Sequence, residues 1–215
     1  MKPLTLYKTL YSHFGPQYWW PGQSKFEVCV GAILTQNTAW GNVEKTINNL
    51  KRENALSISK ILAMHQKSVA KLIKPSGYYN QKAKKLKAFC KHIELNYDGN
   101  LKSFLKKPTK ELREELLSLY GIGQETADSI ILYAAEKPIF VVDAYTVRFV
   151  LRFYTKTGLS YVEAQTLFES QLPKDEKLFN EFHALLVEFG KNYCKKKPEC
   201  SRCFLNKECS YAKPS

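Results

Sequence analysis

Long hydrophobic runs and acidic side chains are both scarce in this sequence, and each scarcity narrows what the protein can be. No run of eighteen apolar residues occurs, and the opening Met1-Lys2-Pro3-Leu4 lacks the layout of a secretory leader, so we expect neither membrane insertion nor secretion. Internal repeats, low-complexity tracts and long linkers are absent as well. We therefore expect a cytoplasmic protein built from one or two compact domains.

The shortage of acidic residues leaves a large positive charge. The 215 residues include 33 Lys and Arg but only 20 Asp and Glu, which gives a formal net charge of +13. Such an excess indicates a polyanionic partner. Around an apolar stripe, one segment carries five lysines: Lys82, Lys84, Lys85, Lys87 and Lys91. A solvated lysine face is the ordinary interpretation, but the overall charge favours a surface that follows phosphates.

A glycine hairpin between two apolar-faced segments is the central feature. Gly121-Ile122-Gly123 allows a tight turn whose backbone is not shielded by side chains. Helical spacing of apolar residues flanks it, at Leu112, Leu116 and Leu117 before and at Ala127, Ile130, Ile131 and Ala134 after. The second helix would present free N–H groups that suit a phosphate. An ordinary helix–turn–helix corner remains the alternative.

Asp143 follows the apolar run 139–142 and precedes a segment with apolar residues at helical spacing: Val147, Val150, Leu151 and Tyr154. By itself this position suits the N-cap of the helix that follows.

Aromatic residues gather in Tyr18-Trp19-Trp20-Pro21-Gly22, a segment too rich in turn formers to be a helix interior. The cluster could be a hydrophobic plug beneath a loop, or a surface on which a base stacks. Trp40 has the spacing of a helical core residue.

Four of the six cysteines lie close together near the C-terminus. Cys194, Cys200, Cys203 and Cys209 give Cys-x5-Cys-x2-Cys-x5-Cys, a density that favours a metal or an iron–sulfur cluster over disulfides in a cytosolic protein. Four thiolates suit zinc as well as iron. Cys29 and Cys90 stand alone in apolar segments and are expected to be buried.

These motifs together resemble the endonuclease III superfamily of DNA glycosylases. Leu-x-Gly-Ile-Gly-x-x-Thr-Ala followed by Val-Asp-Ala-Tyr-Thr-Val-Arg is similar to its helix-hairpin-helix and catalytic-aspartate segment. The resemblance implies that Asp143 is catalytic and that Gly121 and Gly123 contact DNA. Eighteen positions before the aspartate, where bifunctional members carry a lysine, this chain has Glu125. A Schiff base needs an amine, and no lysine occurs between Leu119 and Glu136, so we expect a monofunctional enzyme.

From Trp19 onward the chain looks most like the 3-methyladenine glycosylase branch. That resemblance implies a base pocket formed by Trp20, Pro21, Trp40 and Glu125, in which Glu125 favours a positively charged base. Leu-Thr-Gln-Asn-Thr is similar to the loop whose glutamine enters the duplex at the vacated position, which makes Gln36 the candidate. Without the resemblance, Gln36 would be a cap or turn residue. The segment 77–83 also looks like the superfamily, and Lys82 is expected to contact DNA.

The cysteine spacing resembles the superfamily's Cys-x6-Cys-x2-Cys-x5-Cys, which binds a [4Fe-4S] cluster. This implies the same cofactor here, preferred over zinc, in a loop that presents Lys195, Lys196, Lys197 and Arg202 to phosphate. The first gap is one residue shorter than in the superfamily. The 3-methyladenine branch itself lacks the cluster, and it has a pocket lysine where this chain has Leu185.

The sequence thus predicts an all-α, two-lobed helix-hairpin-helix DNA glycosylase fold with a C-terminal iron–sulfur cluster loop. One lobe is expected to span residues 23–136, and the other to combine 1–22 with 137–215. The expected function is base excision repair of alkylated purines in double-stranded DNA by a monomer, at the nucleoid. Excision of mismatched or oxidised bases, and damage binding without catalysis, are the alternatives.

Overall fold

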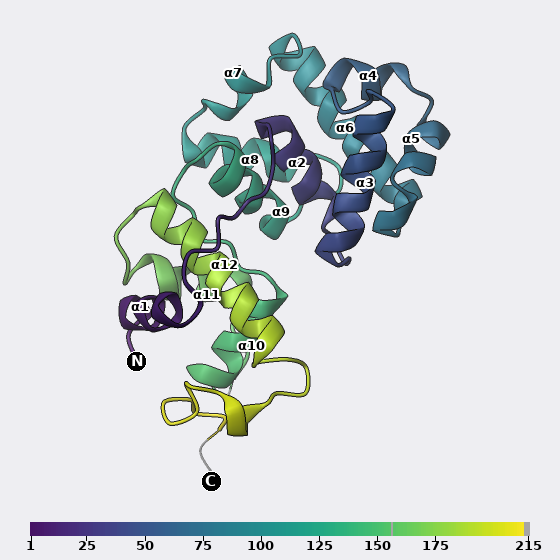
Figure 1. Ribbon diagram of the computed structural model, residues 1–215. Helices are drawn as coiled ribbons and strands as arrows, with labels where there is room; N and C mark the ends of the chain where they lie inside the picture. The colour runs from purple at the N-terminus through teal and green to yellow at the C-terminus, as the bar shows by residue number, and fades with distance from the viewer. Residues whose placement is uncertain (156, 213–215) are drawn as a thin grey trace. The chain divides into compact units, whose positions relative to one another are not determined.

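The computed structural model describes residues 1–155 and 157–212, and all regular secondary structure in these ranges is helical (Figure 1). The predicted all-α fold is therefore confirmed. The chain divides into two compact units, one formed by Trp20–Lys137 and the other by Met1–Trp19 together with Pro138–Ser215. Within the described ranges, no helix has both the length and the apolarity needed to cross a membrane.

The unit Trp20–Lys137 is built around α2, which is buried on almost every side. Its sequence Val28–Leu34 contains no charged residue, and every residue in it is buried, as expected for a helix that is apolar all round. Helix α2 packs on α3, α6, α9 and η2, while α4 and α5 cover α6. The elements are α2 (Lys25–Leu34), α3 (Trp40–Arg52), α4 (Ile58–Ala63), α5 (Gln66–Leu72), the 3-10 turn η1 (Lys74–Ser76), α6 (Tyr79–Tyr97), α7 (Leu101–Leu105), α8 (Thr109–Ser118), α9 (Gln124–Ser129) and the π-helical η2 (Ile130–Ala134).

The other unit joins the two ends of the chain, since α12 packs on both α1 and α10. Its core is aromatic: the rings of Phe140 and Phe168 stack with centroids 4.3 Å apart, and Phe179 and Phe182 meet Phe140 edge-on. The elements are α1 (Pro3–Phe14), α10 (Ala144–Phe153), α11 (Tyr161–Glu169), α12 (Glu176–Asn192) and the 3-10 turn η3 (Cys200–Arg202).

The hairpin between α8 and α9 is fixed by a glycine and by a buried ion pair. Gly121 has a φ of +76°, and a Cβ at this position would lie 2.5 Å from the Cε of Lys85, so only glycine fits. Below the turn, the Arg113 guanidinium donates to both carboxylate oxygens of Asp128 at 2.6 and 3.1 Å. Asp128 is fully buried. The pair therefore connects α8 to α9. A shift of either helix would expose one of these charged groups to solvent or leave it without its partner.

The helix after the hairpin differs from the expected α-helix. Winding is α-helical only to Ser129, and Ile130–Ala134 is π-helical, with the Ala135 amide donating to the Ile130 carbonyl five residues earlier. The predicted apolar residues Ala127, Ile130, Ile131 and Ala134 are nevertheless all buried. Periodicity alone did not separate the two windings, because this short segment is buried on every side.

We predict that Asp128→Asn lowers the free energy of unfolding by about 3 kcal/mol, because it leaves the Arg113 guanidinium without its buried carboxylate. Urea unfolding followed by circular dichroism measures the loss. Lys25→Gln is the matched control in the same unit: it removes the exposed pair with Glu136 and should cost less than about 1 kcal/mol. Equal losses for the two variants would show that the buried pair does not hold the hairpin.

Candidate active site

Two of the predicted pocket aromatics meet in the unit Trp20–Lys137, and a third joins them. The ring of Trp40 lies edge-on to Trp20 with centroids 5.0 Å apart, and Tyr133 from η2 packs on Trp20 at the same separation. The Trp20 indole lies flat on α2 at Gly31, where a Cβ would come within 3.1 Å of the ring. Tyr133 was not predicted as a site residue. Its position in a π-helical turn, which is frequent at functional sites, depends on a winding that the sequence pattern does not reveal.

A cavity of about 360 Å³ opens beside this aromatic cluster. Trp20, Pro21 and Trp40 form its apolar wall, which brings together three of the four predicted pocket residues. The remaining lining residues are Gln23, Glu27, Glu44, Ile47, Asn48 and Lys51. The fourth predicted residue, Glu125, does not line this cavity; it lies exposed in the first turn of α9.

Gln36 is attached to the hairpin by its side chain. Its amide nitrogen donates to the Gly121 carbonyl at 3.1 Å and to the Thr126 hydroxyl at 2.9 Å, while its amide oxygen accepts from the Lys85 ammonium. These hydrogen bonds therefore connect the loop between α2 and α3 to the glycine turn. At Gly123, by contrast, a Cβ would meet nothing within 4 Å, so the backbone there is open.

The expectation that Lys82 contributes to an exposed lysine surface is wrong. Lys82 is only 2% exposed, and its ammonium donates to the carbonyls of Leu34 and Ser76 at 2.9 and 2.6 Å. Burial, with a smaller contribution from the nearby Lys85 charge, lowers the pKa of Lys82 to about 8. The group therefore joins the end of α2 to η1. The lysine run could not reveal this, because the burial depends on Leu34, which lies 48 positions away.

Asp143 lies in the other unit, at the start of α10. One carboxylate oxygen accepts from the Thr146 amide at 2.7 Å, so Asp143 is the N-cap of this helix. The second oxygen lies 3.7 Å from Nε2 of His183. Burial by itself would raise the pKa of this carboxyl, but His183 and the Thr146 amide outweigh it, and the pKa of Asp143 is lowered. The residue is therefore both a cap and an ionised, mostly buried carboxylate.

His183 is the neighbour of Asp143 that the sequence analysis missed. It is 5% exposed and lies on α12 between the buried residues Phe182 and Ala184. A histidine inside a buried stripe is the signal that could have identified it, because a buried imidazole needs a polar or charged neighbour.

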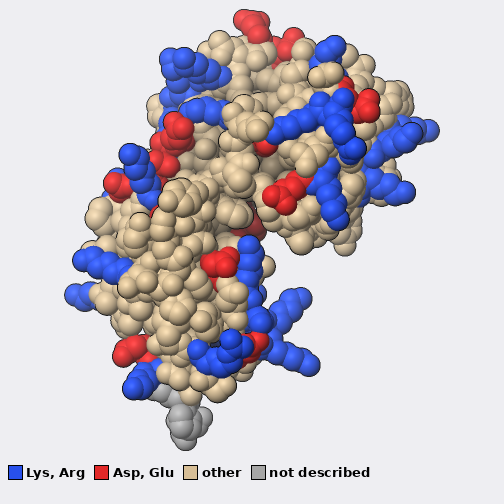
Figure 2. Space-filling model, in the orientation of Figure 1, with Lys and Arg blue, Asp and Glu red and all other residues tan. Residues whose placement is uncertain are grey.

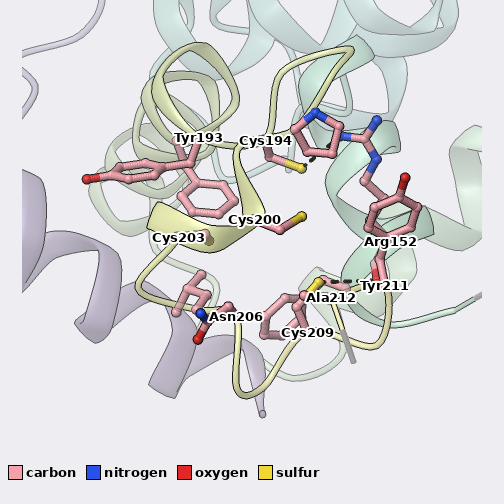
Figure 3. A pocket seen from close by; sticks show the side chains of 13 residues that line it. Arg152, Tyr193, Cys194, Cys200, Cys203, Asn206, Cys209, Tyr211 and Ala212 are labelled. Atoms are coloured by element: carbon pink, nitrogen blue, oxygen red, sulfur yellow. Dashed lines mark hydrogen bonds between the residues drawn. The ribbon is translucent and has the colours of Figure 1, made fainter. Parts of the chain in front are cut away.

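The four C-terminal cysteines line one cavity, as Figure 3 shows for the sulfur atoms of Cys194, Cys200 and Cys209. All four are free thiols, and Phe153, Phe189 and Leu205 supply apolar walls. Within residues 1–155 and 157–212, no three His, Cys, Asp or Glu side chains are grouped closely enough to hold a metal ion. The donor set around the cavity is nevertheless four thiols, which is compatible with an iron–sulfur cluster.

Two arginines of α10 hold the cysteine loop. Arg148 donates to the Cys194 carbonyl at 2.7 Å, and Arg152 donates to the Lys195 and Lys196 carbonyls at 2.6 and 2.9 Å. Arg152 also donates to the Cys194 sulfur at 3.3 Å. These roles were not predicted, although the spacing of i and i+4 puts both arginines on one face of the helix.

The predicted phosphate contacts Lys195 and Arg202, near the four cysteines, are exposed and form ion pairs. Lys195 and Arg202 both pair with Glu199, at 2.5 and 3.0 Å, and Arg202 keeps 77% of its side-chain surface exposed. More broadly, lysine and arginine side chains are spread over the face of each unit drawn in Figure 2, with acidic side chains in smaller separate groups.

Comparisons with known proteins agree with this arrangement. Residues 30–174 match the family described as HhH-GPD superfamily base excision DNA repair protein. The chain is 48% identical over 211 residues, 95% of this chain and 94% of the relative, to the Methanocaldococcus jannaschii protein named "Putative DNA repair glycosylase MJ1434".

Two solved structures are also similar. The H. pylori 3-methyladenine DNA glycosylase MagIII, bound to 1,N6-ethenoadenine, is 31% identical with a TM-score of 0.78; the match covers 89% of this chain and 98% of that chain. A trapped covalent intermediate of endonuclease III with DNA superposes with a TM-score of 0.83 at 21% identity, covering 99% and 97%, and supports the fold.

We predict that His183→Phe raises the pKa of Asp143, because the substitution keeps the burial and removes the imidazole that favours the carboxylate. In the wild-type protein the stability contributed by ionised Asp143 is present above the ordinary Asp pKa of about 4 and is lost as the pH falls through the lowered value. Carboxyl ¹³C NMR titration measures the change. His92→Phe, whose ring pairs with Glu115 in the other unit, is the control. An unmoved Asp143 titration in His183→Phe would contradict the assignment.

Proposed function

Because the chain belongs to the HhH-GPD superfamily of base excision DNA repair proteins and is a DNA glycosylase, we propose that it removes alkylated purines such as 3-methyladenine from duplex DNA. The observation that carries this proposal is the aromatic cluster of Trp20, Trp40 and Tyr133 beside a cavity of about 360 Å³. The 31% identity with a 3-methyladenine DNA glycosylase over 89% of this chain supports the same substrate class.

The aromatic wall accounts for recognition of a damaged base. A glycosylase takes its target out of the stack, which costs a few kcal/mol and is easier for a damaged base. Indole and phenol faces stack on any base and attract a cationic ring electrostatically. Purines alkylated on a ring nitrogen carry that positive charge and are good leaving groups. Tight packing of Trp20 against Gly31 keeps this wall in place.

Asp143 would act on the sugar. Cleavage of the N-glycosidic bond builds positive, oxocarbenium-like character on the sugar ring, which an adjacent carboxylate stabilises. The lowered pKa of Asp143 keeps this carboxylate ionised at neutral pH, and the Thr146 amide fixes its orientation. The same carboxylate can orient or deprotonate the attacking water. The product is a free base and an abasic site.

We propose that the enzyme has no lyase activity. A lyase needs an amine that attacks the sugar, and Glu125 occupies the position that corresponds to that amine in bifunctional members. Glu125 lies exposed in the first turn of α9, where its charge also suits the helix dipole. Its proposed role is to interact with the positively charged base.

The hairpin and its neighbours would hold the DNA backbone. Gly121 and the open backbone at Gly123 are proposed to approach a phosphate, and Lys195 and Arg202 to contact the DNA from the cysteine loop. Gln36 is proposed to enter the duplex at the vacated position. To do so it would release the Gly121 carbonyl, the Thr126 hydroxyl and the Lys85 ammonium, and that ammonium would become available to a phosphate.

Cys194, Cys200, Cys203 and Cys209 are the proposed ligands of a [4Fe-4S] cluster. When bound, the cluster would cross-link the four cysteines and so hold the C-terminal loop in one conformation. The chain's own contribution is the clamp from α10, in which Arg148 and Arg152 hold the carbonyls of residues 194–196. Zinc is the competing occupant, and metal content separates the two.

We predict that the wild-type protein releases 3-methyladenine from methylated duplex DNA and that Asp143→Asn lowers the rate at least about 100-fold, because the charge on the sugar is no longer stabilised. Glu125→Gln should reduce release of cationic bases more than that of neutral bases. Chromatography of the freed bases measures both effects. Thr146→Ser, which keeps the capping amide, is the control for α10.

If wild-type protein instead releases only oxidised or mismatched bases from defined oligonucleotides, the substrate class is wrong. If Asp143→Asn retains full activity, the catalytic assignment is wrong. Cleavage of the strand at the abasic site, or trapping of a borohydride-stable adduct, would overturn the proposal that lyase activity is absent.

We also predict that purified protein is brown, with broad absorption around 400 nm, and contains iron. Cys203→Ser should lose the colour and most of the iron. Cys29→Ala is the control, since Cys29 is fully buried in the other unit and should not affect the iron content. Zinc without iron in the wild-type protein would contradict the cluster assignment.

A further inference from the structure

We propose that the cavity between the segment 20–24 and α3 selects cationic over neutral purines through the carboxylates of Glu27 and Glu44. The inference rests on the proposed function for its biological substrate, and it assigns selectivity to residues outside the hairpin and the catalytic helix. The ligand class is a planar, positively charged purine ring.

The cavity has one aromatic and one polar side, both formed within a single unit. Trp20 and Pro21 come from the segment before α2, and Trp40 begins α3. Glu44 and Lys51 follow Trp40 at i+4 and i+11, so they continue the same face of α3 into the cavity. A ring that stacks on the indoles therefore lies beside the charged side chains of this face.

Glu27 lines the cavity because its carboxylate does not complete the capping box at the start of α2. Ser24-Lys25-Phe26-Glu27 has the spacing of a capping box, in which the glutamate would turn back to the Ser24 amide. The first half is present, since the Ser24 hydroxyl accepts from the Glu27 amide at 3.2 Å. The Glu27 carboxylate instead lies 2.9 Å from the Lys51 ammonium, and Glu27 is only 7% exposed. A buried carboxylate thus forms part of the cavity wall.

The charge balance of the cavity is opposite to that of the chain. Two carboxylates, Glu27 and Glu44, face one ammonium, Lys51, and Lys51 is further held by the Gln23 side-chain oxygen at 2.9 Å. In a protein of net charge +13, which attracts phosphate over its surface, this cavity disfavours an anion. Coulomb attraction at reduced dielectric and cation–π attraction both favour a cationic ring, whereas a neutral base gains stacking alone.

Binding of free nucleosides tests the cavity without catalysis. 1-Methyladenosine is a cation at neutral pH, and adenosine is a neutral purine nucleoside of nearly the same size. Quenching of tryptophan fluorescence should give an affinity for 1-methyladenosine at least about 10-fold higher than for adenosine. Glu44→Gln should reduce this ratio about threefold or more. Glu44 is exposed, so the variant should fold, and Glu53→Gln at the end of α3 but outside the cavity is the matched control.

The rate of base release then tests whether the cavity also determines selectivity during catalysis. Glu44→Gln should lower the ratio of kcat/KM for cationic 7-methylguanine to kcat/KM for neutral 1,N6-ethenoadenine about threefold or more. Glu27→Gln should shift the same ratio in the same direction, with circular dichroism confirming that it folds. Equal effects on both bases, or no effect of Glu44→Gln on the nucleoside ratio, would overturn the inference. If the charge-dependent binding holds but no alkylated base is released, the inference stands and the proposed function fails.

Discussion

The buried pair between Arg113 and Asp128 is the constraint on which the hairpin side of the unit Trp20–Lys137 depends. It fixes α9 against α8, and α9 carries Thr126, whose hydroxyl accepts from Gln36. The same helix continues into η2, where Tyr133 packs on Trp20. One carboxylate with no exposed surface thus anchors the helix that contacts both the hairpin loop and the aromatic wall.

Three charged groups, Glu27, Lys82 and Asp143, lie where helix ends can stabilise them. Helix α2 has an anion, Glu27, in its first turn and a cation, Lys82, at its last carbonyls, so the dipole of the most buried helix is complemented at both ends. Asp143 similarly caps the positive end of α10, whose arginines hold the cysteine loop. The candidate catalytic carboxylate and the candidate cluster site are therefore joined by one short helix.

The sequence predicted the parts of the fold that local patterns encode. Apolar spacing predicted the helices on both sides of Gly121, and the alternative interpretation of Asp143 as an N-cap is also correct. Residues whose environment depends on distant partners were missed. Lys82 is buried by carbonyls from other segments, His183 is given a role by Asp143 forty positions away, and Tyr133 depends on a π turn that apolar spacing cannot distinguish from an α turn.

The pairing of α1 with α12 brings the two ends of the chain into one unit, with the whole of Trp20–Lys137 inserted between them. Contacts between such distant segments are entropically expensive, and α12 follows the whole of the inserted unit in the chain. During synthesis the inserted unit can therefore fold before α12 has emerged from the ribosome to pack on α1. The helix that carries His183 follows the whole of the inserted unit and α10, so the environment of Asp143 is completed only after both have been synthesised.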